Sequence, residues 1–142
     1  MSEHWVLIDQ DTGLHVGWYF WLRVLDEVNR SARYGAPFGL LLLETPGDEH
    51  DARHALSSLP GAIRGTDLGG RLGTHRAGVV LMNQDVAGAR LGVERVLERL
   101  EAAGPHARWD TRLLTYPEDG GEISMLLTTG WQPAGAPIRR PA

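Results

Sequence analysis

The uninterrupted apolar run at residues 38–43 (FGLLLL) constrains the fold more than any other stretch of this sequence. A strand with one solvated face alternates apolar and polar residues, and this run shows no such alternation. The run therefore predicts a strand that is buried on both faces. Such a strand needs helices packed above and below it, or a central position in a sheet.

Helical spacing of apolar residues predicts helices on both sides of this strand. Residues 17–34 carry one such stripe, and Gly35 fits the position just past a helix end. The clearest stripe begins after Asp85, which we expect to be an N-cap, and ends at Gly104. A weaker pattern covers residues 48–64, where a Pro-Gly pair must interrupt the helix.

The remaining segments predict a hairpin, a further strand and a short helix. Residues 67–72 and 79–82 read as strands joined by a turn at 73–76, residues 109–116 as a strand, and residues 123–127 as a helix. The order is helix, strand, helix, hairpin, helix, strand, helix. This order predicts an α/β fold with a mixed central β-sheet flanked by helices, because the hairpin forces one antiparallel pairing.

Length and composition limit the domain count and the class of protein. A chain of 142 residues buries one core, so we expect one domain at 1–130 and a Pro/Gly-rich C-terminal tail at 131–142. The absence of cysteine and lysine excludes disulfides, thiolate catalysis and the phosphate-binding lysine of a P-loop. The net charge of −4 comes without a basic stripe, so we expect no nucleic-acid or membrane partner. No signal peptide or membrane span is recognisable, which predicts a cytoplasmic protein.

Two local patterns have more than one interpretation. His50 and His54 are spaced like metal ligands on a helix, but no third ligand is apparent, so a solvated helix face is favoured. The four consecutive aromatic residues 18–21 (WYFW) cannot all face one core. They either contact a partner surface or pack within the domain, and the sequence favours neither.

Several segments occur in an order and at a spacing that are specific when taken together. They are residues 9–14 (DQDTGL), Glu27, Arg30, residues 33–35 (RYG), 37–44 (PFGLLLLE), 71–81 (RLGTHRAGVVL) and 115–120 (TYPEDG). From residue 9 to about residue 130, the chain resembles the GGDEF domain, the fold of diguanylate cyclases. The resemblance implies a nucleotide-cyclase-like α/β fold and a role in bacterial cyclic di-GMP signalling.

The signature motif of that family is altered at residues 73–77 (GTHRA). His75 replaces an acid that helps to hold the catalytic metals in the family, and Arg76 cannot coordinate Mg²⁺. Glu44 matches the family's strand-end aspartate, but a lone carboxylate is a poor site for two-metal phosphoryl transfer. The segment 44–64, which in the family supplies groups that read guanine, is also short. We therefore expect a degenerate member with no catalytic residue, no metal, no cofactor and no cyclase activity.

The resemblance also implies a separate product-binding site that needs no metal. Its Arg-x-x-Asp motif matches Arg64 and Asp67, and a further family arginine falls on Arg95. An arginine fork can donate two parallel hydrogen bonds to guanine or phosphate, and an aspartate can accept from guanine N–H groups. The first hypothesis is an inactive cyclic di-GMP receptor that uses Arg64, Asp67 and Arg95 and signals to an unidentified protein partner.

The alternative is a ligand-independent module for protein–protein interaction or dimerisation. An exposed Arg–Asp pair is usually a solvated surface pair, and Arg95 could be one of several charges on a helix face. In that case residues 18–21 would matter more than Arg64, and the chain could act as a homodimer or a scaffold subunit.

Overall fold

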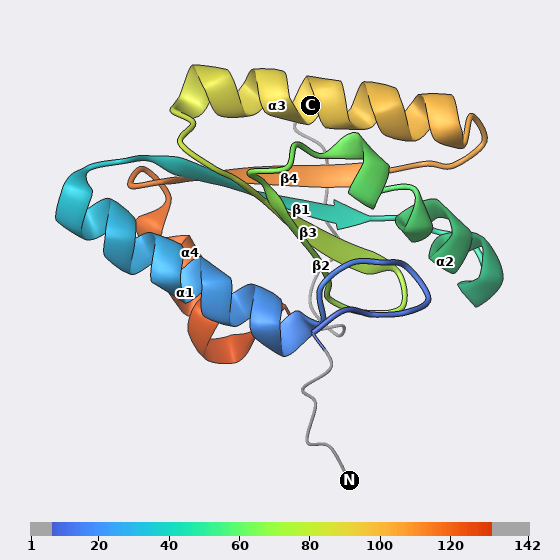
Figure 1. Ribbon diagram of the computed structural model, residues 1–142, viewed down its shortest axis with the longest axis horizontal. Coiled ribbons are helices and arrows are strands. Elements are labelled where there is room, and N and C mark those ends of the chain that lie inside the picture. The colour runs from blue at the N-terminus through green and yellow to red at the C-terminus, as the bar shows by residue number, and fades with distance from the viewer. Residues whose placement is uncertain (1–6, 132–142) are drawn as a thin grey trace, which may run out of the picture.

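The computed structural model describes residues 7–131 of the chain (Figure 1). The predicted tail at 131–142 lies outside the described residues except for its first residue. The helices are α1 (Gly17–Tyr34), α2 (Glu49–Ser57), α3 (Val86–Ala103) and α4 (Gly120–Thr129), with a short 3₁₀ turn, η1 (Pro60–Ala62). The strands are β1 (Phe38–Glu44), β2 (Leu68–Arg71), β3 (Arg76–Leu81) and β4 (Asp110–Tyr116).

One four-stranded sheet with the order β2-β3-β1-β4 organises the domain. All three pairings between these strands are antiparallel, which corrects the expected mixed sheet. Each crossover helix does connect two strands that run in the same direction, but another strand lies between them, as in the split βαβ arrangement. The described residues contribute one parallel pairing, an isolated bridge between His15 and Gly70.

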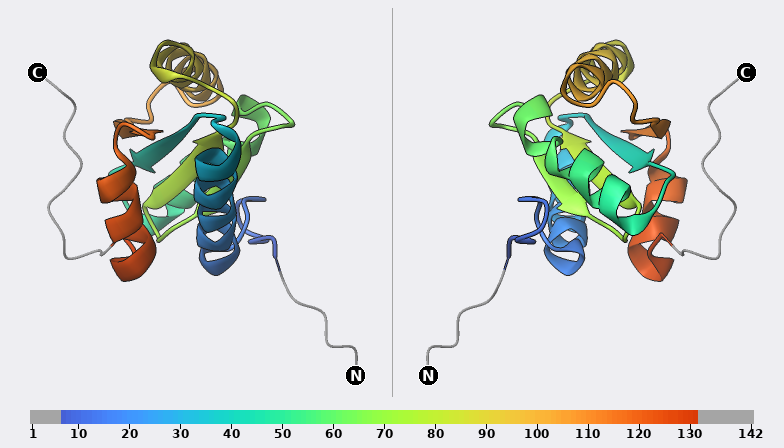
Figure 2. Two further views of the ribbon diagram at one scale, coloured as in Figure 1. Left: turned by 90° about the vertical axis from the view of Figure 1, so that its left-hand side faces the viewer. Right: turned by 90° about the vertical axis from the view of Figure 1, so that its right-hand side faces the viewer.

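The central strand β1 is buried on both faces, as its sequence predicts. Leu41 and Leu43 point into a core beneath α2 and α3, whereas Leu40 and Leu42 point into a second core beneath α1 and α4. Figure 2 shows the sheet between these two helical layers. The fold class predicted from the sequence is therefore confirmed, with helices flanking a central sheet.

The helix boundaries follow the predicted capping residues. Gly35 adopts a left-handed conformation with φ 74° and donates its N–H to Ser31, which ends α1. Asp85 accepts a hydrogen bond from the N–H of Gly88 at the start of α3. Pro60 opens η1 directly after α2, so the predicted interruption is also present. The last helix is longer than expected.

Glycines in the hairpin let α1 approach the sheet closely. A Cβ atom built on Gly70 would lie 2.5 Å from the Phe20 ring, and one on Gly78 would lie 2.7 Å from it. Phe20 is fully buried in the space that these glycines leave. Along residues 18–21, Trp21 also packs on this core while Trp18 is 53% exposed, so the aromatic cluster is divided between core and surface.

Within residues 7–131, no helix combines the length and apolar character that crossing a membrane requires.

Candidate functional site

Residues 73–77, which the resemblance aligns with the family's signature motif, lie at the β2–β3 hairpin, next to the end of β1. Glu44 and Arg76 face each other across the β1–β3 pairing. Arg76 Nε lies 3.2 Å from Glu44 Oε1, and the Arg76 side chain is only 9% exposed. The carboxylate that matches the family's strand-end aspartate thus has a guanidinium partner from its own chain.

Two further contacts enclose this ion pair. The ring of Trp131, just after α4, lies 4.5 Å from the Arg76 guanidinium in cation–π geometry. At the hairpin turn, His75 Nε2 lies 2.9 Å from the carbonyl oxygen of Gly47. The His75 carbonyl in turn accepts a 2.9 Å hydrogen bond from the N–H of Thr45. The turn is therefore held against the β1–α2 loop.

Across the described part of the chain, no group of three or more His, Asp or Glu side chains is arranged to hold a metal ion. In a site that carries Arg76 beside Glu44, the fixed positive charge repels a divalent cation. The residues around Glu44 therefore fit a metal poorly. The expectation that the chain needs no metal stays a prediction.

Arg71 links the hairpin to the turn before α1, a connection that the sequence analysis missed. Its Nη1 lies 3.1 Å from Asp9 and 3.6 Å from Asp11, and its Nε donates to the carbonyl of Gly73. Asp9 and Arg71 both belong to segments that carry the family resemblance. The presence of both residues in these segments was the sequence signal from which their contact could have been predicted.

Arg64 and Asp67 form a two-point ion pair on the turn between η1 and β2. Arg64 Nε and Nη2 donate to the two carboxylate oxygens of Asp67 at 3.3 and 3.4 Å. Asp67 also accepts a 3.2 Å hydrogen bond from the N–H of Met82. The Asp67 side chain is fully buried and Arg64 is 41% exposed. The structure thus brings these two predicted residues together, with Asp67 holding the arginine fork.

A cavity of about 160 Å³ lies beside Asp67, and α1 contributes part of its wall through Arg23 and Glu27. Glu27 is 7% exposed at its side chain and pairs with Arg30 at 3.1 Å. Arg30 also donates to Asn83 across the chain at 3.1 Å. A hydrogen bond with the Tyr19 hydroxyl raises the pKa of Arg23 above its usual value, so Arg23 stays charged. The sequence patterns did not predict a role for these α1 residues in the site.

Arg95 lies on α3 and is half-buried. Its Nε is buried and has no hydrogen-bond partner among the described residues. Its neighbour Arg99, one turn along α3, donates to the carbonyl of Gly61 at 3.4 Å. Among residues 7–131, no hydrogen bond or ion pair joins Arg95 to Arg64 or Asp67.

Solved structures share the fold of this chain, whereas its sequence alone matches no known family. No protein-family model and no curated protein matches the sequence. A DGC protein from Thermotoga maritima is 18% identical, with a TM-score of 0.67 over 86% of this chain and 98% of the other. The GGDEF domain of DgcB from Caulobacter crescentus, solved with cyclic di-GMP, is 10% identical, with a TM-score of 0.71 over 90% and 89%.

A third similar structure is the diguanylate cyclase SiaD from Pseudomonas aeruginosa, solved with its activator SiaC. It is 17% identical, with a TM-score of 0.65 over 87% of this chain and 57% of that one. The fold is that of a GGDEF domain. In this GGDEF-like domain, the Glu44–Arg76 pair occupies the end of the central strand, and the Arg64–Asp67 pair lies on the turn that precedes β2.

Proposed function

We propose that this GGDEF-like domain is a catalytically inactive receptor for cyclic di-GMP. The observation that carries the loss of catalysis is the Glu44–Arg76 ion pair, because an internal guanidinium takes the place of a metal ion beside the only acid that matches the family's metal site. Trp131 over Arg76 further limits access to that carboxylate.

The proposed binding function rests on the Arg64–Asp67 pair. Asp67 engages Nε and Nη2 of Arg64, and the Arg64 side chain is 41% exposed. An arginine held by a buried carboxylate is oriented before a ligand arrives, which lowers the entropic cost of binding. Arg64 would donate to a guanine edge or a phosphate of the ligand. Asp67 would position Arg64.

Arg95 would supply a second cationic contact. Its buried Nε lacks an acceptor among the described residues, and an anionic or carbonyl oxygen of a ligand would satisfy it. Because no hydrogen bond links Arg95 to the Arg64–Asp67 pair, the ligand itself would bridge them. A cyclic dinucleotide, with two bases and two phosphates, has enough polar groups to do so.

Isothermal titration calorimetry with cyclic di-GMP tests the proposal. We expect a dissociation constant in the low micromolar range or tighter, which rises with added salt. Arg64→Ala and Arg95→Ala should each weaken binding at least about tenfold, since each removes a charge-assisted contact. Arg90→Ala is the matched control, because Arg90 is an exposed arginine on the same helix as Arg95 and should bind as the wild type does. Absence of binding heat would remove the receptor function.

A separate assay tests the loss of catalysis. The protein at high concentration, supplied with GTP and Mg²⁺, should form no cyclic di-GMP, whereas a known diguanylate cyclase in the same assay should do so. Detectable product that disappears in Glu44→Gln would show that the carboxylate still serves catalysis and would overturn this part of the proposal.

A second candidate function is a ligand-independent interaction module. Trp18, Leu22 and Leu25 recur at helical spacing on α1 and are 53%, 46% and 43% exposed. An exposed apolar stripe of this kind is typical of contact surfaces. Sedimentation analysis would detect a homodimer, and Leu22→Glu should dissociate it. A wild-type monomer without a stable partner would argue against this candidate.

A further inference from the structure

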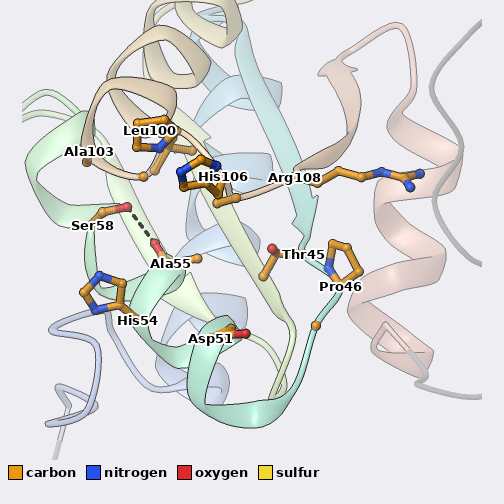
Figure 3. Close-up of a pocket in the computed structure, with 14 residues that line it drawn as sticks. Thr45, Pro46, Asp51, His54, Ala55, Ser58, Leu100, Ala103, His106 and Arg108 are labelled. Carbon is orange, nitrogen blue, oxygen red and sulfur yellow. Dashed lines mark hydrogen bonds between the residues drawn. The ribbon is translucent and has the colours of Figure 1, made fainter.

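A cavity of about 550 Å³ lies between α2 and the C-terminal end of α3 (Figure 3). It shares no lining residue with the smaller cavity beside Asp67, so it is a different site. Its volume falls within the range of pockets that hold small organic molecules. The proposed function gives this cavity no role.

Small and apolar side chains from two elements form much of the cavity wall. Ala55 comes from α2, Leu100 and Ala103 come from α3, and Ala107 follows α3 in the chain. Alanines on facing surfaces leave space that larger side chains would fill in a packed core. The hollow therefore offers apolar walls to the body of a ligand.

Thr45 contributes a buried polar group to the same cavity. The residue is only 2% exposed, and its position is fixed by the hydrogen bond from its N–H to His75. Among the residues that the structure describes, none makes a hydrogen bond with the Thr45 hydroxyl. Because Thr45 lines the cavity, its hydroxyl is available to hydrogen-bond a ligand there.

Among the lining residues that the structure describes, Asp51 is the one acid. Its carboxylate lines the hollow and makes no ion pair with any residue between 7 and 131. Arg108 also belongs to the lining, but it is 74% exposed at its side chain and pairs with Asp110 at 3.4 Å. Figure 3 shows the Arg108 side chain extending away from the other labelled residues. The carboxylate therefore remains available to a positively charged group.

We propose that this cavity binds a small organic amine with a flat apolar body. The ammonium group donates to the Asp51 carboxylate and to the Thr45 hydroxyl, while the ring packs against Ala55 and Leu100. A charge-assisted hydrogen bond in a partly enclosed site is stronger than one between neutral groups. The site therefore selects amines over carboxylic acids of the same shape.

The experiment follows amide resonances of the full chain by NMR while 2-phenylethylamine is added. We expect saturable shifts at residues 45–58 and 100–108, with a dissociation constant on the order of 1 mM. The anion 3-phenylpropionate, which carries the same phenylethyl body, should produce no saturable shift at these residues. Cyclic di-GMP is absent, so the outcome does not depend on the proposed receptor function.

Variants separate recognition by Asp51 from general attraction to an acidic surface. Asp51→Asn should weaken amine binding about tenfold, and Thr45→Val should weaken it about threefold, whereas Glu49→Gln removes a nearby exposed acid and should leave it unchanged. Each variant must keep the wild-type NMR spectrum away from the cavity. Equal binding of the anion, equal weakening by Glu49→Gln, or no saturable shift with the amine would overturn the proposal.

Discussion

Arg76 Nε donates to Glu44 Oε1 at 3.2 Å across the β1–β3 pairing, so the chain supplies its own cation to the end of its central strand. This relationship follows from register, because the two residues are directly opposed. Removing one partner of a partly buried ion pair strongly destabilises the folded protein. The pair therefore connects the proposed loss of metal chemistry to the stability of the domain.

We predict that Arg76→Ala destabilises the domain by about 1–3 kcal/mol, because the Glu44 carboxylate loses its ion pair with Arg76. Urea unfolding measures the change. Arg112→Ala is the control, since Arg112 pairs with Glu122 at the surface, with side chains 49% and 41% exposed, and should cost less than about 1 kcal/mol. Equal costs for the two variants would contradict the enclosed character of the Glu44–Arg76 pair.

Trp131 should stabilise the domain partly through Arg76. Trp131→Leu keeps an apolar side chain but removes the cation–π contact, which is worth about 0.5–2 kcal/mol. In a double-mutant cycle, most of that cost should vanish when Arg76 is already alanine. Thermal or urea unfolding of the four proteins gives the coupling energy, and a coupling of zero would mean that the ring acts only through its packing.

Asp67 and Arg64 should differ in their effects on stability. Asp67→Ala removes a buried carboxylate and leaves the N–H of Met82 without this acceptor, so we expect a loss of about 1–3 kcal/mol. Arg64→Ala removes a half-exposed partner and should cost less. Comparing unfolding free energies with the calorimetric binding data separates the two roles. A greater loss of stability from Arg64→Ala than from Asp67→Ala would contradict the assignment of Asp67 as the residue of the pair that stabilises the fold.

Gly70→Ala should destabilise the domain through overpacking. The new methyl group would lie 2.5 Å from Phe20, and the fully buried ring has no space to retreat, so we expect a cost of about 1–3 kcal/mol. Gly121→Ala is the contrasting change, because a Cβ there meets nothing within 4 Å in α4 and should stabilise the helix by about 0.5–1 kcal/mol. Urea unfolding measures both, and a neutral Gly70→Ala would mean that α1 can shift away from the sheet.

Local sequence patterns predicted much of the fold. The unbroken apolar run of β1 predicted burial on both faces, because alternate residues of a strand point to opposite sides and all of them are apolar. Gly35 and Asp85 predicted where α1 ends and where α3 begins, since capping depends on residues that are close in sequence. The Arg64–Asp67 contact was also accessible, because three residues separate its members.

The strand order, and with it the antiparallel sheet, required the tertiary structure. Pairing between β1 and its neighbours joins segments tens of residues apart, and no local pattern specifies which strand lies between two others. For the same reason the sequence indicated that Arg76 cannot coordinate Mg²⁺, but not that the ring of Trp131 lies against its guanidinium. The cavity between α2 and α3 depends on how small side chains from distant segments face each other. Sequence alone thus determined the elements and their buried faces, whereas long-range packing decided which polar groups meet, because such contacts form only when the whole sheet is assembled.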